Sequence, residues 1–157
     1  MAQALKRLQK ELREFNKEEP EGITAGPIDD SEFFKWEASV LGPEDSPYEG
    51  GTFNLYIEFS RNYPYRPPKM FITTKIFHPN LNYESGQICC CALDFLKEWS
   101  PDISISQILK AFQQLLKCPN IDKVCGLGNE YARKLYEEYR AKYESIAIEW
   151  TQKYATE

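Results

Sequence analysis

Apolar residues recur at helical spacing over the first part of the chain. The positions that would share one face of an amphipathic helix are Leu5, Leu8, Leu12 and Phe15. We expect this helix to end just before Pro20, because the residue that precedes a proline is disfavoured in the helical region. The chain therefore opens with a helix that can bury one of its faces.

Three later segments have the pattern of strands. Residues 52–59 alternate strictly, with Phe, Leu, Ile and Phe at every second position. Residues 34–41 and 70–74 are two further strand-like runs, and the glycine- and proline-rich segment 42–51 predicts a turn. Strands that follow one another in this way favour antiparallel pairing. Residues 63–68 contain three prolines, which predict an exposed, extended loop because proline cannot donate to a strand ladder.

The hydrophobic period changes to that of a helix after Pro101. Ser104 can cap this helix, and Gln107 completes a capping box. We expect the helix to end near Cys118, which Pro119 follows. Residues 129–154 again have a helical pattern, either as two helices or as one long helix with a break. The predicted fold class is α+β: an N-terminal helix, an antiparallel meander sheet, an irregular cysteine segment and C-terminal helices.

Composition limits the class of protein. The chain has 157 residues, of which 42% are hydrophobic, and this fits one globular domain spanning 1–157. The formal net charge is -5, whereas a nucleic-acid-binding protein of this size is more often basic. The first helix nevertheless has a basic stripe, for which the simplest interpretation is a solvated face. Its members are Lys6, Lys10, Arg13 and Lys17.

The cysteines and the apolar runs indicate the compartment. Five cysteines, three of them consecutive, do not resemble the spaced framework of a secreted protein. The first residues lack the apolar core of a signal peptide, and no apolar run approaches the roughly 20 residues that cross a bilayer. We therefore expect a protein of the cytosol or nucleus with free thiols and no membrane segment.

The cysteine triplet, residues 89–91, is the main candidate for chemistry. A thiolate is both a good nucleophile and a good leaving group, so it can accept an acyl group and pass it on. A Cys–His hydrolase would need His78, the only histidine, as its base, but no third orienting group is evident. A zinc site is disfavoured because adjacent cysteines do not converge as spaced pairs do, and Cys118 and Cys125 lack the spacing of a second pair. Asn80 can either donate a hydrogen bond to an oxyanion or cap its own turn.

Several motifs together resemble the active-site region and scaffold of ubiquitin-conjugating enzymes. The segments that carry the resemblance are His78-Pro79-Asn80, Gly86-Gln87-Ile88-Cys89, Trp99-Ser100-Pro101, Gly42-Pro43 with residues 48–51, the loop 63–68 and residues 149–155. They occur in order through nearly the whole chain. The closest likeness is to the short, single-domain members that serve many ligases.

The resemblance implies a four-stranded sheet and acyl transfer without a cofactor or metal. A cysteine would take ubiquitin from the activating enzyme as a thioester, and a RING- or HECT-type ligase would direct it to a lysine or to the ligase's own cysteine. Asn80 would stabilise the oxyanion or hold the active-site loop, and His78 would be structural. We expect a monomer that binds neither nucleic acid nor membranes.

The resemblance also assigns the binding surfaces. The basic residues Lys6, Arg7 and Lys10 would meet the activating enzyme. Exposed residues of two loops, Tyr65, Ser100 and Pro101, would meet ligases. Thr24 falls where related enzymes carry a serine on a surface that binds a second ubiquitin noncovalently.

The chain departs from the family pattern around the cysteines. Counting forward from Gly86 selects Cys89 as the nucleophile, whereas counting back from Trp99 selects Cys91. In an extended segment these two point to one side and Cys90 to the other, so Cys90 is the weakest candidate. We expect Cys89 to be the nucleophile, with Cys91 as the next candidate.

A second departure is Lys123, where relatives often carry an acidic residue that orients the incoming lysine. Asp122 is the candidate to take its place. Asp102 is also atypical and predicts a narrower choice of ligases, because a charge at the rim of an interface changes partner choice. Two other functions stay open: a conjugating enzyme for another ubiquitin-like modifier, and an inactive adaptor that binds ubiquitin noncovalently.

Overall fold

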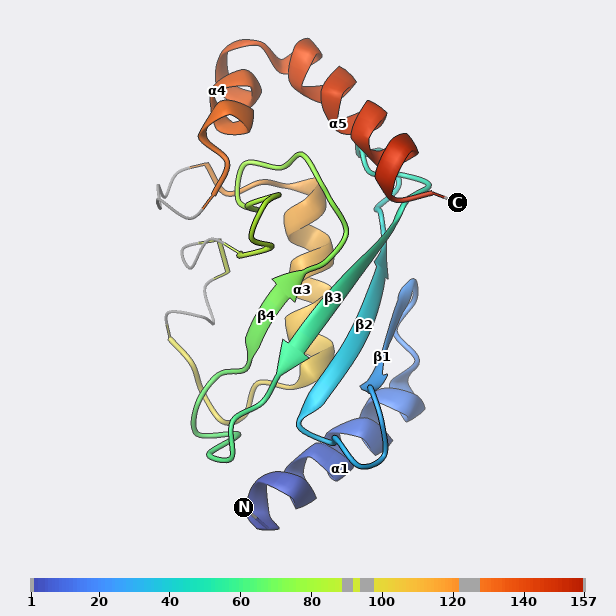
Figure 1. Ribbon diagram of the computed structural model, residues 1–157, viewed down its shortest axis with the longest axis vertical. Coiled ribbons are helices and arrows are strands. Elements are labelled where there is room, and N and C mark those ends of the chain that lie inside the picture. Colours follow the sequence, from blue (N-terminus) through green and yellow to red (C-terminus); the bar gives the residue numbers. More distant parts are fainter. Residues whose placement is uncertain (1, 89–91, 94–97, 122–127, 157) are drawn as a thin grey trace.

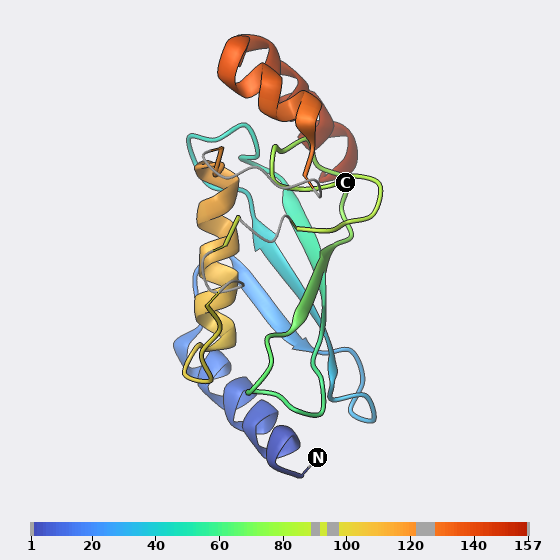
Figure 2. The same cartoon turned by 90° about the vertical axis from the view of Figure 1, so that its left-hand side faces the viewer.

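A four-stranded sheet with a helix packed across one of its faces forms the centre of the protein (Figures 1 and 2). The computed structural model describes residues 2–88, 92–93, 98–121 and 128–156. Its elements are α1 (Ala2–Glu18), β1 (Ile23–Pro27), β2 (Lys35–Leu41), β3 (Thr52–Glu58), β4 (Lys69–Ile72), α3 (Ile105–Lys117), α4 (Glu130–Glu138) and α5 (Arg140–Tyr154). This order confirms the predicted α+β class.

The strands form an antiparallel meander in the order β1-β2-β3-β4. The alternation in residues 52–59 is confirmed, because Phe53, Leu55 and Ile57 are buried while Thr52 and Asn54 are exposed. Strand β1 was not predicted from the hydrophobic pattern, since glycine and proline fill two of its five positions. Its pairing with β2 supplies the fourth strand that the family resemblance implies.

The core lies between the inner face of the sheet and α3. On the sheet side it contains Trp36, Ala38, Val40, Phe53, Leu55, Ile57, Met70 and Ile72. Helix α3 contributes Ile105, Ile108, Leu109, Phe112, Leu115 and Leu116. The capping box predicted from Ser104 and Gln107 is present, with both of its hydrogen bonds formed. The described helices leave the outer face of the sheet open (Figure 2).

Helix α1 is fastened to the first turn of α3 by acidic side chains. The carboxylate of Glu11 accepts a hydrogen bond of 2.6 Å from the backbone N–H of Ile105. Glu18 accepts from the hydroxyl of Ser106 at 2.6 Å and pairs with Lys110. Glu11 is buried, and desolvation raises the pKa of its carboxyl. The apolar spacing of the first helix gave no sign of this buried acid.

The C-terminal region consists of two helices, as one of the two sequence alternatives predicted. They are separated at Tyr139, whose φ of -138° and ψ of 63° are not helical. Near the end of α5, the ammonium of Lys75 lies 4.8 to 5.3 Å from the ring centroids of Tyr83, Trp150 and Tyr154. This aromatic cage joins the helix to the segment that follows β4. Among the described residues, no helix has the length and apolarity needed to cross a membrane.

Candidate active site

His78 is a fixed part of the fold beside the predicted catalytic asparagine. Its side chain is fully buried, its Nδ1 accepts a hydrogen bond of 3.0 Å from the backbone N–H of Asn80, and its Nε2 lies 2.8 Å from the carbonyl oxygen of Leu115. Because Nδ1 accepts, Nε2 must carry the proton and donate to that carbonyl. Burial lowers the pKa of His78 to about 4. Both ring nitrogens are therefore engaged, which favours the structural role over that of a general base.

Asn80 connects its turn to the residues that follow α3. Its Nδ2 donates to the carbonyl oxygen of Asn120 at 2.9 Å, and its Oδ1 accepts from the backbone N–H of Asn120 at the same distance. A carboxamide has two amide hydrogens, so one further donor belongs to this nitrogen. The reciprocal pair supports a loop-holding role for Asn80.

Tyr48 supports the same segment from the side of α5. Its buried hydroxyl lies 2.6 Å from the carbonyl oxygen of Phe77, to which it donates, and 2.6 Å from the hydroxyl of Tyr143. Since Phe77 directly precedes His78, the turn is held from two sides: through Tyr48 and through Leu115. This rigid support suits a group that has to be presented in one orientation.

A short reversal of the chain leads from this turn toward the cysteines. Leu81 pairs with Ile88, and the N–H of Asn82 donates to Gln87 at 3.0 Å. Gly86 has a φ of +78°, and a Cβ atom there would lie 2.4 Å from the carbonyl oxygen of Ile72. Glycine is required at this position because a side chain would collide with β4. The Gly86 step of the motif thus has a steric reason.

The nucleophile candidates themselves are not placed by the structure. Cys89, Cys90 and Cys91 lie outside the described residues, as do Asp122 and Lys123. Ile88 ends the described segment before the cysteines, and Ala92 and Leu93 follow them as buried residues. The choice of nucleophile and the role of Asp122 therefore stay predictions.

The two loops predicted to meet ligases are brought together. The indole Nε1–H of Trp99 donates to the carbonyl oxygen of Pro64 at 2.6 Å, and the rings of Tyr63 and Trp99 are 6.2 Å apart. Tyr65, the residue after Pro64, is 70% exposed. Pro101 is also exposed, whereas Ser100 is half-buried. A single hydrogen bond thus joins the neighbours of Tyr65 and Ser100.

The basic residues of α1 differ in their surroundings. Lys6 and Lys10 are exposed, and Lys10 lies 3.9 Å from Glu14. The side chain of Arg7 is only 23% exposed, with its Nε 3.4 Å from Oε1 of Glu11. Lys6 and Lys10 are therefore available to a partner, while Arg7 is partly occupied within the molecule.

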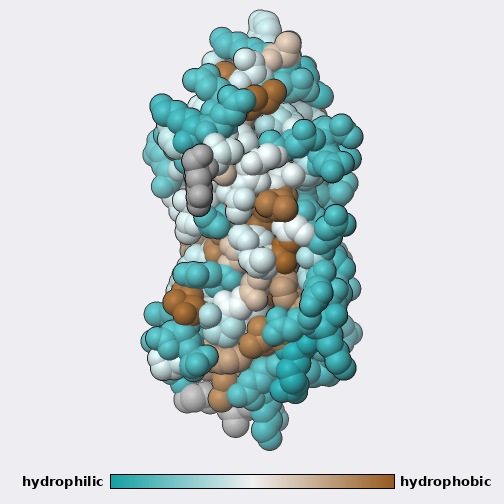
Figure 3. Space-filling view, turned by 90° about the vertical axis from the view of Figure 1, so that its right-hand side faces the viewer, coloured by the Kyte–Doolittle hydropathy of each residue, from teal (hydrophilic) through white to brown (hydrophobic). Residues whose placement is uncertain are grey.

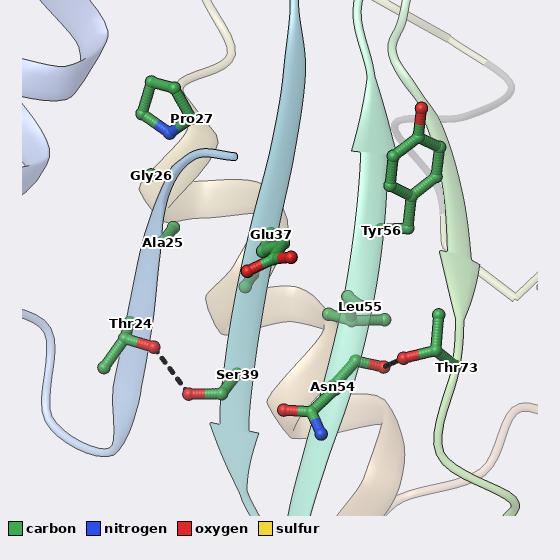
Figure 4. Close-up of a pocket in the computed structure, with 11 residues that line it drawn as sticks. Thr24, Ala25, Gly26, Pro27, Glu37, Ser39, Asn54, Leu55, Tyr56 and Thr73 are labelled. Carbon is green, nitrogen blue, oxygen red and sulfur yellow. Dashed lines mark hydrogen bonds between the residues drawn. The ribbon is translucent and has the colours of Figure 1, made fainter. Parts of the chain in front are cut away.

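Thr24 lies on the open outer face of the sheet, away from the turn at Asn80. Its hydroxyl is 2.5 Å from that of Ser39 on the neighbouring strand, and Asn54 follows on the next strand (Figure 4). A shallow hollow of about 780 Å³ covers this part of the sheet and extends to Glu37 and Tyr56. From the right-hand side of Figure 1, where this face is seen edge-on, the surface is largely hydrophilic with hydrophobic side chains between the polar ones (Figure 3).

Sequence reasoning missed the partners that fix the site. Asn120 and Leu115 act through backbone atoms, for which the identity of the side chain gives no signal. Glu11 was missed because a charged residue normally faces solvent. The indole of Trp99 was recognised as part of a motif, but its bond to Pro64 was not predicted.

The chain is similar to known proteins over nearly its whole length. The sequence model described as "Ubiquitin-conjugating enzyme" matches residues 7–151. A solved structure described as that of "a putative ubiquitin conjugating enzyme from Plasmodium yoelii" is 41% identical, with a TM-score of 0.87. The match covers 98% of this chain and 96% of that chain. The likeness therefore extends over both the sheet and the helices.

Proposed function

The chain belongs to the ubiquitin-conjugating enzyme family, and from this premise we propose that it carries ubiquitin as a cysteine thioester and transfers it under the direction of a ligase. Members of this family are conjugating transferases that interact with the modifier, an activating enzyme and ligases. The observation that carries the proposal is the fixed turn at His78 and Asn80, which leads through the Gly86 reversal toward the cysteine triplet.

The proposed reaction has two acyl transfers. In the first, a cysteine thiolate of this chain attacks the thioester carbonyl of ubiquitin on the activating enzyme. A new C–S bond forms and the activating enzyme's thiolate leaves. In the second, a neutral lysine amine attacks the same carbonyl carbon, the C–S bond breaks and the amine loses a proton as the isopeptide forms. With a ligase that has its own cysteine, a second thiolate replaces the amine.

We propose Cys89 as the nucleophile, because the described chain up to Ile88 follows the motif that Gly86 fixes. Cys91 is the next candidate. Asp122 is proposed to orient the incoming amine in place of the acidic residue that relatives often have at the position of Lys123, where a cation repels a lysine ammonium.

We propose that Asn80 acts chiefly by holding the loop. The reciprocal hydrogen bonds to Asn120 occupy its oxygen and one of its amide hydrogens. The second amide hydrogen is the group that can donate to the oxyanion of the tetrahedral intermediate. Both roles use the same orientation of the carboxamide.

The binding surfaces follow the family pattern. Exposed Lys6 and Lys10, together with Arg7, are proposed to meet the activating enzyme. Tyr65, Ser100 and Pro101 are proposed to meet RING- or HECT-type ligases, and the hollow at Thr24 is proposed to bind a second ubiquitin noncovalently. We place the reaction in the cytosol or nucleus.

The deciding experiment replaces each cysteine of the triplet separately by serine, with Cys118→Ser as a control at an exposed thiol outside it. The purified proteins are incubated with ubiquitin, activating enzyme and ATP. The true site changes a thiol-sensitive adduct into a more stable oxyester when serine replaces it. We expect this for Cys89→Ser and an unchanged thiol-sensitive adduct for Cys118→Ser.

A thiol-sensitive adduct that persists in Cys89→Ser would overturn the choice of Cys89. Parallel reactions with other ubiquitin-like modifiers and their activating enzymes identify the modifier. Absence of any thiol-sensitive adduct on the wild-type protein, with ubiquitin binding retained, would instead support the inactive adaptor.

A further inference from the structure

Arg7 has a position unlike that of the other basic residues of α1. Its Nε lies 3.4 Å from Oε1 of Glu11, its Nη2 lies 3.5 Å from the carbonyl oxygen of Ile103, and its Cζ is 5.7 Å from the ring centroid of Tyr63. Each contact is long for its kind, but all three converge on one guanidinium. Exposed Arg13 on the same helix offers a natural comparison.

The three contacts belong to the three elements that surround the proposed ligase surface. Glu11 is on α1, Tyr63 begins the loop that carries Tyr65, and Ile103 follows Pro101 by two positions. The hydrogen bond from Trp99 to Pro64 already joins the two loops to each other. Arg7 joins both of them to the helix.

The guanidinium suits this position better than an ammonium would. Its planar fork has five N–H donors, so it can address a carboxylate and a carbonyl at once while its face lies against a ring. A lysine provides a single point charge and cannot reach three directions together. Glu11 links Arg7 to α3 as well, because its buried carboxylate also caps α3 and has Arg7 as its cationic neighbour.

We propose that Arg7 is a positioning residue for the ligase-binding loops, which fixes the loop of Tyr65 and the segment of Pro101 relative to α1. The inference rests on the proposed function, because it concerns the loops assigned to ligases. Besides its proposed contact with the activating enzyme, Arg7 thus has a role within the molecule that the exposed Lys6 and Lys10 do not share.

The test compares Arg7→Lys with Arg13→Lys, which makes the same charge-preserving exchange at an exposed position of the same helix. The first readout is the chemical shift of the Trp99 indole N–H in a proton–nitrogen correlation NMR spectrum of the isolated protein. The signal is assigned by its absence from the spectrum of Trp99→Phe. The second is the discharge of ubiquitin from the thioester at increasing concentrations of a RING domain that stimulates the wild-type enzyme.

We expect Arg7→Lys to shift the Trp99 signal and to raise the apparent KM for the RING domain by about fivefold or more, which corresponds to about one kcal/mol. The kcat at saturating RING domain should stay within about twofold of the wild type, since a change of that size in a rate is under half a kcal/mol. Arg13→Lys should match the wild type in both readouts. Glu11→Gln, which keeps an acceptor for Ile105 but removes the charge, should shift the Trp99 signal in the same direction.

An unchanged KM in Arg7→Lys, or an equal effect of Arg13→Lys, would overturn the proposal. A raised KM with an unshifted Trp99 signal would also overturn it, since it would make Arg7 a direct contact of the ligase. Failure of the wild type to form a thioester would count against the proposed function, and the Trp99 signal of the isolated variants would then decide the positioning role by itself.

Discussion

Asn80 and Asn120 hold each other by two hydrogen bonds of 2.9 Å across 40 positions of the sequence. Asn80 is 4% exposed, so these hydrogen bonds replace most of the contact that its carboxamide would have with water. The pair closes the turn of His78 against the end of α3. Any change at Asn80 should therefore affect both the stability of the protein and the orientation of the loop.

Asn80→Ala should lower the free energy of unfolding by about 1–3 kcal/mol, because both backbone groups of Asn120 lose their partner. Transfer to lysine should fall on the order of 10²-fold if the donor also serves the oxyanion. Urea unfolding and single-turnover discharge to free lysine measure the two effects.

Asn80→Asp is the matched control for that prediction. The aspartate keeps an oxygen for the N–H of Asn120 but loses the donor for its carbonyl. It should be no more stable than Asn80→Ala, because a buried carboxylate oxygen would face the carbonyl oxygen of Asn120, and it should still be slow in lysine transfer. Full transfer activity in Asn80→Asp would contradict a need for the amide donor.

His78 should make stability depend on pH. Its folded pKa of about 4 lies below the ordinary value of 6.5, so the unfolded chain binds more protons between these two values. The contribution is complete above pH 6.5 and is lost as the pH falls toward 4. Between pH 7 and pH 5 the free energy of unfolding should decrease by about 2 kcal/mol through this group.

His78→Gln separates this effect from that of every other titrating group, because it removes only the imidazole. The variant should be less stable at pH 7, yet lose much less stability between pH 7 and pH 5. Urea titrations at both pH values measure the difference. Parallel losses in the wild type and the variant would show that His78 is not the titrating group.

Tyr65→Ala should weaken ligase binding without unfolding the protein. The side chain is 70% exposed, so the free energy of unfolding should change by less than about 0.5 kcal/mol. An aromatic anchor in an interface is typically worth about 2 kcal/mol or more, which predicts a roughly 30-fold rise in the Kd for a RING domain.

Tyr139→Ala is the control for the change at Tyr65. This tyrosine is 59% exposed and lies between α4 and α5. Its variant should bind the same RING domain as the wild type does in isothermal titration calorimetry. Equal loss of affinity in both variants would contradict the prediction that Tyr65 is an anchor of the ligase interface.

Thr24→Arg should abolish noncovalent ubiquitin binding on the outer face of the sheet. A long cation would fill the hollow beside Ser39 and Asn54 and place an unmatched charge there. When the nitrogen-15-labelled variant is titrated with ubiquitin, the chemical-shift changes expected at β1 to β3 of the wild type should be absent. Thioester formation should continue. Glu32→Arg, at another exposed position, should leave the titration unchanged.

Lys75→Gln should destabilise the attachment of α5. Loss of the cation from the three rings predicts a decrease of about 1 kcal/mol in the free energy of unfolding, whereas Lys75→Arg should keep most of it. Urea unfolding of the two variants provides the comparison. Equal stability of the Gln and Arg variants would argue that the aliphatic stem, rather than the charge, matters.

Features of the fold that depend on residues close together in the sequence were predicted. The end of α1 before Pro20, the alternation of β3 and the capping box of Ser104 with Gln107 were all predicted, because each depends on neighbours a few positions apart. Strand β1 was missed, since glycine and proline reduce strand propensity and only its pairing with β2 stabilises it.

The site was predictable in its side chains but not in its connections. Asn80 and His78 were recognised through a motif, whereas their partners Asn120 and Leu115 contribute backbone atoms from distant positions. Glu11 is buried because the first turn of α3 needs an acceptor, and that need becomes visible only when the two helices meet.

The bond between Glu11 and Ile105 has a consequence for how the protein folds. It joins residues 94 positions apart, so α1 cannot find its final contacts until the chain has been synthesised beyond α3. Contacts of such long sequence separation slow folding, because a large loop has to close before they form. Synthesis proceeds at about 5–20 residues per second, so several seconds pass between the synthesis of α1 and that of α3, against which α1 packs. The first helix to be made therefore gains this contact only after the whole sheet and the start of α3 have been made.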